Sequence, residues 1–158
     1  MAGRGRGPYD SGLLKGSDGN FYGVAGSGGP NDAGIVYKLT PAGDETIVYA
    51  FNPSAGSGSE PEGALVEDSD GNLYGGTQSG GYPRTVYGIQ GPSLTGQSGT
   101  IFEITAAGNA VQLSNFGPTD ADGTSPSGPL IQGQDGTLYG VTANGGANDA
   151  GVFYKITR

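Results

Sequence analysis

A repeat of about 52 residues is the feature that most restricts how this chain can fold. One segment occurs three times, as SDGNFYGVAGSGG at 17–29, SDGNLYGGTQSGG at 69–81 and QDGTLYGVTANGG at 134–146. A second segment follows each copy, as GIVYKLTPAG at 34–43, GTIFEITAAG at 99–108 and GVFYKITR at 151–158. A period of this length indicates a repeat architecture in which each copy is one supersecondary unit.

The spacing of the copies locates one insertion. Asp18 and Asp70 are 52 positions apart, whereas Asp70 and Asp135 are 65 apart. The glycines that open the second segment show the reverse order, 65 positions and then 52. Both series agree if the second copy contains 13 additional residues between Gly81 and Gly99. We therefore expect a flexible Gly/Arg arm at 1–7, a first repeat at 8–60, a second at 61–125 with the insertion at 82–98, and a third at 126–158 without its last strand.

Each repeat is predicted to form two β-hairpins. In every copy an Asp-Gly pair stands between short apolar runs, and glycine accepts the positive φ that such tight turns need. The aspartate always precedes the glycine, which indicates that its side chain caps the turn by accepting hydrogen bonds from backbone N–H groups. The expected turn residues are Asp18, Gly19, Asp70, Gly71, Asp135 and Gly136. No segment shows a helical period, so the chain is predicted to be all-β.

The third strand expected in each repeat is apolar on both faces. Tyr37, Phe102 and Tyr154 are equivalent on one face, and Val36, Ile101 and Phe153 are equivalent on the other. A strand of this kind needs a cover on each side, and the neighbouring blades of a propeller supply it. The expected fold is therefore β-propeller-like, with four-stranded antiparallel blades and about 2.75 blades per chain.

So few blades cannot close a ring, because propellers typically have roughly 4–8 of them. An open stack leaves apolar faces and a strand edge bare, which favours association. We therefore expect homo-oligomerisation that completes a ring or stack, or a filament if the contact does not close. A piece excised or engineered from a longer array is the alternative.

The repeated pattern resembles a known bacterial family. P-x-G-x-L-x-x-D-x-D-G-N-L-Y-G-x-T-x-x-G-G, followed by G-x-V/I-F/Y-K/E-L/I-T-x-x-G, is similar to the GloVer-type (choice-of-anchor) tandem repeat family over about residues 8–158. The layout also resembles kelch repeats. This resemblance implies propeller-like folding and an extracellular or cell-surface location in bacteria, and it implies no established catalytic residues.

Composition argues against several classes of function. The chain has no cysteine and no histidine, which removes disulfides, thiolate metal sites and the commonest general base. A net charge of −8 argues against nucleic acid or an anionic membrane as the main partner. No apolar run reaches the length of a membrane span, and we expect no signal peptide within this chain. We predict no cofactor, no membrane insertion and no enzymatic activity.

The insertion is the one non-repeating element, and such loops on rigid repeats often carry function. Its side chains Tyr82, Arg84, Tyr87 and Gln90 offer stacking faces and hydrogen-bond donors for a glycan or a protein ligand. The same loop could instead pack on a neighbouring blade or form part of a subunit contact.

One turn has the composition of a calcium loop. Asp68, Asp70 and Asn72 supply oxygen atoms, but the distal glutamate of an EF-hand is absent and a hard cation needs about six to eight ligands. No metal is therefore predicted, and calcium is the alternative. The predicted function is a non-catalytic structural protein that assembles with itself into homo-oligomers or filaments. The alternative is an extracellular module that binds a carbohydrate or protein ligand through 82–98.

Overall fold

The computed structural model describes residues 12–81, 99–116 and 123–157. The first sheet consists of β1 (Leu14–Lys15), β2 (Phe21–Ala25), β3 (Ile35–Leu39) and β4 (Glu45–Ala50). The second consists of β5 (Ser59–Glu67), β6 (Leu73–Ser79), β7 (Thr100–Ile104) and β8 (Ala110–Asn115). The third consists of β9 (Thr124–Gln132), β10 (Leu138–Asn144) and β11 (Phe153–Ile156). One 3-10 turn, η1 (Pro53–Ala55), joins β4 to β5, and the described residues contain no α-helix.

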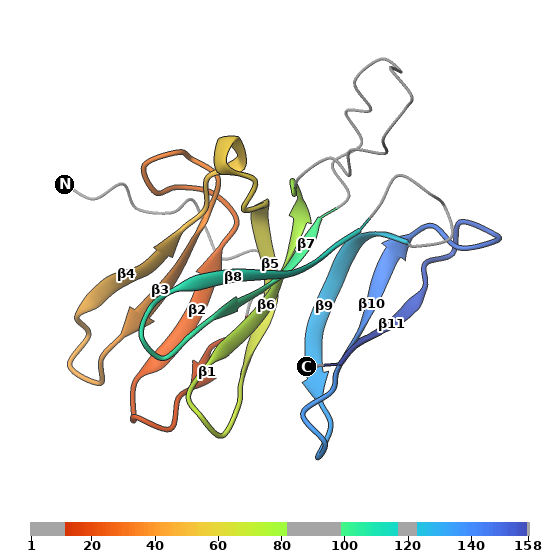
Figure 1. Cartoon of the computed structure of the whole chain (residues 1–158). Coiled ribbons are helices and arrows are strands. Elements are labelled where there is room, and N and C mark those ends of the chain that lie inside the picture. The colour runs from red at the N-terminus through yellow and green to blue at the C-terminus, as the bar shows by residue number, and fades with distance from the viewer. Residues whose placement is uncertain (1–11, 82–98, 117–122, 158) are drawn as a thin grey trace.

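The three sheets are antiparallel throughout, and the strands of each follow one another in chain order. The sheets lie side by side in a row, with the first and third at its two ends (Figure 1). The prediction of an all-β, propeller-like fold with antiparallel blades is confirmed. None of the described segments forms a helix with the length and apolarity needed to cross a bilayer.

The predicted Asp-Gly turns share one backbone geometry. Gly19, Gly71 and Gly136 have φ angles of 83°, 81° and 80°, and each donates its N–H to the carbonyl three residues earlier. In the first of these turns the hairpin is closed by a hydrogen bond of 2.8 Å from the Gly16 N–H to the Asn20 carbonyl. This is the three-residue hairpin loop, a type I turn followed by a left-handed residue. Glycine occupies the last position because an L side chain is strained there.

The first strands of the second and third sheets, β5 and β9, lie next to each other, and we call them the inner strands. Both are longer than the apolar runs within them. The pairing of β5 with β6 shifts register between Glu62 and Val66. β5 lies against β2 on one side and against β9 on the other. Gly63 has a φ of 81°, and a Cβ placed on it would lie 2.6 Å from the carbonyl oxygen of Gly128. Glycine at 63 therefore allows the backbones of β5 and β9 to approach each other.

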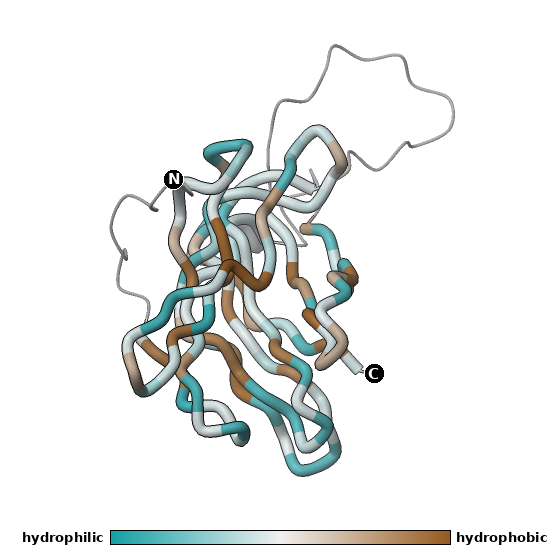
Figure 2. Tube along the Cα trace, turned by 90° about the vertical axis from the view of Figure 1, so that its left-hand side faces the viewer, coloured by the Kyte–Doolittle hydropathy of each residue, from teal (hydrophilic) through white to brown (hydrophobic). Residues whose placement is uncertain are grey.

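Two apolar clusters hold the row of sheets together. The first lies between sheets one and two, where Val36 and Phe51 meet Phe102, and the rings of Phe51 and Phe102 contact edge to face at 5.1 Å. The second lies between sheets two and three, where Ile101 packs with Leu138. Adjacent residues of β7 thus belong to opposite clusters, and the second sheet is covered on both faces. Figure 2 shows apolar stretches along the strands and hydrophilic stretches at the turns.

Candidate functional site

The two end sheets each present one face that no other sheet formed by the described residues covers. We call the outer face of the first sheet the head face; its exposed and partly exposed apolar residues are Leu13, Phe21, Tyr37, Leu39 and Ile47. We call the outer face of the third sheet the tail face; its apolar residues are Ile131, Tyr139, Val141 and Phe153. Both faces repeat the residue pattern of the faces packed inside the molecule, so they are the first candidates for a contact with a partner.

The tail face is strongly exposed. Phe153 has 70% of its surface accessible and Ile131 has 68%, whereas Ile101, the equivalent of Phe153 in the second sheet, has 0%. The rings of Tyr139 and Phe153 stack at 5.9 Å with an angle of 20° between their planes. The tail face is therefore an ordered apolar surface that, among the described residues, no further sheet covers.

The head face shows the same contrast at a smaller scale. Leu13 has 52% of its surface accessible, against 4% for its equivalent Leu65 in the second sheet. Phe21, Tyr37, Leu39 and Ile47 are all partly exposed. The ring tip of Tyr37 lies where a Cβ on Gly23 would stand, and Phe102 lies in the same way over Gly75. The head face of the first sheet is thus built like the covered head face of the second.

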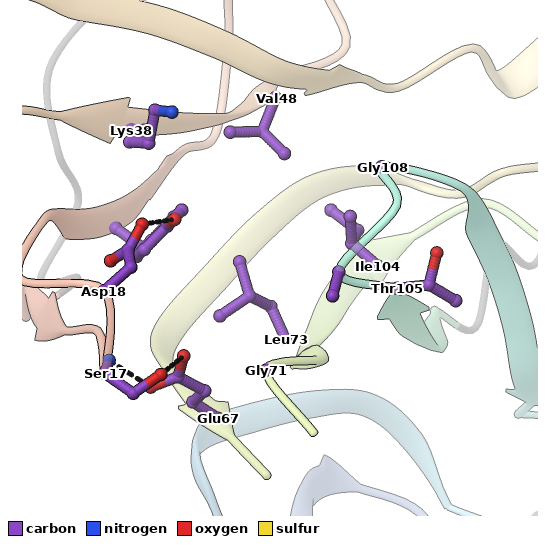
Figure 3. A pocket seen from close by; sticks show the side chains of 12 residues that line it. Ser17, Asp18, Lys38, Val48, Glu67, Gly71, Leu73, Ile104, Thr105 and Gly108 are labelled. Atoms are coloured by element: carbon purple, nitrogen blue, oxygen red, sulfur yellow. Dashed lines mark hydrogen bonds between the residues drawn. The ribbon is translucent and has the colours of Figure 1, made fainter. Parts of the chain in front are cut away.

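A cleft of about 310 Å³ lies between the turns of the first and second sheets. Figure 3 shows Ser17 and Asp18 on one side of this cleft, with Leu73 and Ile104 on the other. The Ser17 N–H and hydroxyl donate to the two carboxylate oxygens of Glu67 at 2.8 and 2.9 Å. This pair of hydrogen bonds joins the two sheets across the mouth of the cleft.

Asp18 and Tyr22 form the most polar part of the cleft. The Asp18 carboxylate accepts hydrogen bonds from the Asn20 N–H, from the Asn20 amide and from the Tyr22 hydroxyl at 3.0, 2.7 and 2.8 Å. The hydrogen bonds from Asn20, and then that from Tyr22, lower the pKa of Asp18. Burial, followed by the hydrogen bond to Asp18, raises the pKa of Tyr22 to about 12. Neither group of this pair exchanges a proton near neutral pH, so the pair is suited to holding the turn and not to acid–base chemistry.

The three predicted turn aspartates differ in what they accept. Asp135 accepts from the Thr137 N–H and hydroxyl at 3.1 and 3.0 Å, and the first of these bonds is the main cause of its lowered pKa. In the second repeat the acceptor is Asp68, which stands two residues before Asp70. It binds the N–H groups of Asp70 and Asn72, each at 2.9 Å. Gly16 and Gly133 occupy the position of Asp68 in the other turns. This difference in the sequence could have predicted that the second turn uses another acceptor.

The calcium candidates Asp68, Asp70 and Asn72 lie together in this second turn. Both Asp68 oxygens accept hydrogen bonds, and the second of them binds the Tyr74 hydroxyl at 2.7 Å. The Asn72 amide oxygen accepts from the Ala106 N–H at 3.0 Å. Across the part of the chain that the structure describes, no three acidic side chains gather as a metal ion would require.

The ligand candidates in the insertion, Tyr82, Arg84, Tyr87 and Gln90, lie outside the described residues. A ligand bound by this loop therefore stays a prediction from the sequence. What sequence reasoning missed is the cleft itself, because the Ser17–Glu67 contact joins residues 50 positions apart in two different repeats.

Comparison with known families matches the whole repeat pattern. The family described as the Gloeobacter/Verrucomicrobia repeat matches residues 2–158. The chain belongs to this family. The resemblance drawn from the motifs is thereby confirmed, and the third sheet is part of a Gloeobacter/Verrucomicrobia repeat like the other two. No curated protein matches the chain.

Solved structures similar to this repeat protein are β-propellers. One is provisionally described as a gluconolactonase, with a TM-score of 0.57 and 12% identity, over 92% of this chain and 48% of that one. Another is the virginiamycin B lyase of Staphylococcus aureus, with a TM-score of 0.54 and 20% identity, over 97% of this chain and 43% of that one. Identities this low show the fold alone. The repeat protein spans slightly less than half the length of either structure.

Proposed function

We propose that this repeat protein is a non-catalytic structural module that associates with further copies of itself through its head and tail faces. The observation that carries the proposal is the exposure of Phe153 and Ile131 on a face whose counterpart in the second sheet is covered. A contiguous apolar surface of this kind marks an interaction site in soluble proteins. Because the face already has the residue pattern of an internal sheet contact, another sheet of the same family is the partner that fits it.

The magnitude of the gain sets the expected affinity. Burying one large apolar side chain contributes on the order of 1.5–3 kcal/mol. Three such side chains on the tail face are strongly exposed, namely Ile131, Val141 and Phe153. Their combined burial is comparable with the roughly 4–15 kcal/mol that association costs in lost freedom of motion. Burial of these three side chains therefore only offsets the cost of association, and the net gain has to come from the apolar side chains of the head face. We expect weak association that becomes detectable at micromolar concentrations.

Light scattering tests this proposal on the whole chain. The mean mass is expected to rise between low and high micromolar concentration, and Phe153→Glu is expected to keep the protein monomeric over the same range. Val111→Glu is the control, because Val111 is also an exposed apolar residue, at 45%, but lies in β8 of the second sheet and on neither end face. A folded chain that stays monomeric at high micromolar concentration would overturn the proposal.

The two similar structures carry names of enzymes, and this chain covers less than half of each. We assign no reaction to the repeat protein. The cleft between the first two sheets supplies a carboxylate and a phenol that are bound to each other, and their pKa values are moved away from neutral pH in opposite directions. That arrangement favours a structural role for the cleft over catalysis.

A further inference from the structure

We infer that the association is head to tail: the tail face of one copy seats on the head face of a second copy, in the register of the internal sheet contacts. This inference rests on the proposed function, since it specifies which surfaces of the two copies meet. Its basis is the similarity between the two internal sheet contacts and the uncovered head and tail faces.

Both internal contacts are of the same kind. Val36 on the tail side of the first sheet packs in one cluster with Phe102 on the head side of the second. Ile101 on the tail side of the second sheet packs in one cluster with Leu138 on the head side of the third. The molecule thus contains a tail-on-head contact twice, and the two uncovered faces are one tail face and one head face. A second copy can form the same contact a third time, with no new type of packing.

The uncovered head face also keeps the arrangement of a ring over a glycine that the covered head faces have. On covered head faces the ring of Phe102 lies over Gly75, and that of Tyr154 lies over Gly140. On the uncovered head face Tyr37 lies over Gly23 in the same way. The uncovered head face of the first sheet therefore has the same shape as the head faces on which tail faces pack inside the chain.

The extent of the similar propellers suggests how the contact closes. This chain covers 48% and 43% of the two solved structures, so two copies have about the length of one such propeller. The described residues of two copies contribute six sheets, a number within the roughly 4–8 blades that propellers contain. A head-to-tail contact is heterologous and forms a ring when its rotation closes. We therefore expect a ring of two chains joined by two identical contacts.

Cysteine cross-linking tests the inference directly, because the chain has no cysteine of its own. Ser17 and Glu67 are hydrogen-bonded across the first internal contact at 2.8 Å. Their equivalents on the uncovered faces are Gln134 beside the tail face and Lys15 on the head face, both exposed. Lys15→Cys and Gln134→Cys are prepared as separate variants and treated with a short thiol-specific cross-linker at a concentration where the wild type associates.

A head-to-tail contact predicts covalent dimer in the mixture of the two variants and little in either variant alone. The double variant Ser17→Cys/Glu67→Cys is the positive control, because its two thiols must be joined within one chain if the reagent spans this contact. Dimer from Gln134→Cys alone would indicate a tail-to-tail contact, and dimer from Lys15→Cys alone a head-to-head contact; either overturns the inference.

The failure of the inference can be told from the failure of the proposed function. If the wild-type mass rises with concentration but the mixture gives no covalent dimer while the control reacts, self-association stands and the head-to-tail contact is wrong. If the wild type stays monomeric at high micromolar concentration, both are wrong.

Discussion

The second and third sheets carry the same apolar pattern in different surroundings. Ile101 of β7 and Phe153 of β11 occupy one repeat position, yet the first is inaccessible and the second has 70% of its surface exposed. The difference does not come from the residues, which are both large and apolar, but from the presence of a neighbouring sheet on that side. In a repeat protein, burial is set by the next copy in the stack, because each copy contacts only its neighbours.

The largest effect that this comparison predicts is on stability. Ile101→Glu places a charge in the apolar cluster between the second and third sheets. Because a buried charge without a partner is costly, this substitution is expected to lower the free energy of unfolding by at least about 3 kcal/mol. Phe153→Glu changes the equivalent position on the uncovered face and is expected to change the free energy of unfolding by less than about 0.5 kcal/mol. Urea unfolding measures both, at a concentration below the one at which light scattering detects association. A similar loss of stability in both variants would mean that the tail face is covered.

A second pair of equivalent positions compares the inner strands. Gly63 in β5 and Gly128 in β9 both have positive φ, at 81° and 73°, but a Cβ on Gly63 would meet the β9 backbone, whereas one on Gly128 would meet nothing within 4 Å. Gly128→Ala should cost about 1–2 kcal/mol for the left-handed conformation alone. Gly63→Ala should cost more, because β5 and β9 must also move apart. Equal losses in the two variants, measured by urea unfolding, would show that the inner strands do not depend on this close approach.

The repeat predicted the sheets, because its turns and apolar runs are local features. The Asp18-Gly19 pair forms a tight turn whichever sheet lies beside it. The length of β5 could not be predicted in the same way, because Pro61 and Gly63 interrupt its alternation and the strand is held by a register shift against β6. The sequence pattern also favoured Asp70 as a turn cap, while Asp68 accepts the hydrogen bonds. Two aspartates in one turn compete, and only the geometry of the turn decides between them.

The contacts between sheets were the least predictable part of the candidate site. That β3 is apolar on both sides indicates two covers, but not which residue of another repeat supplies each one. The hydrogen bonds from Ser17 to Glu67 depend on how the first sheet is rotated against the second, and no motif records that rotation. The cleft beside them is for the same reason absent from any pattern within one repeat.

Tyr154 in the third sheet and Phe102 in the second occupy one repeat position and differ by a hydroxyl group. The pH dependence of stability can therefore be compared with and without that group. Burial raises the pKa of Tyr154 to about 12, above the value of about 10 for a free tyrosine. The stabilisation from its protonated form is fully present below about pH 10 and is lost as the pH rises toward 12. Tyr154→Phe is therefore expected to reduce the loss of stability between these two pH values and to leave stability at pH 7 nearly unchanged. Urea unfolding across this range checks it, and an unchanged alkaline slope would contradict it.

The smallest expected effect concerns charge at the inferred contact between copies. In the first internal contact Lys38 and Glu67 both line the cleft, whereas their equivalents at the contact between two copies would be Lys155 and Lys15. Lys15→Glu restores the opposite charges and supplies a carboxylate for Gln134, the equivalent of Ser17. An exposed pair contributes about 0.2–1 kcal/mol, so the dissociation constant for self-association should fall by about 1.5- to 5-fold for each contact that the dimer forms. Lys15→Gln removes the repulsion without adding the attraction, so its dissociation constant should lie between that of the wild type and that of Lys15→Glu. The gain of Lys15→Glu should shrink as salt is added, because exposed charges are screened, and a weaker association than that of the wild type at low salt would place Lys15 away from Lys155 in the assembly.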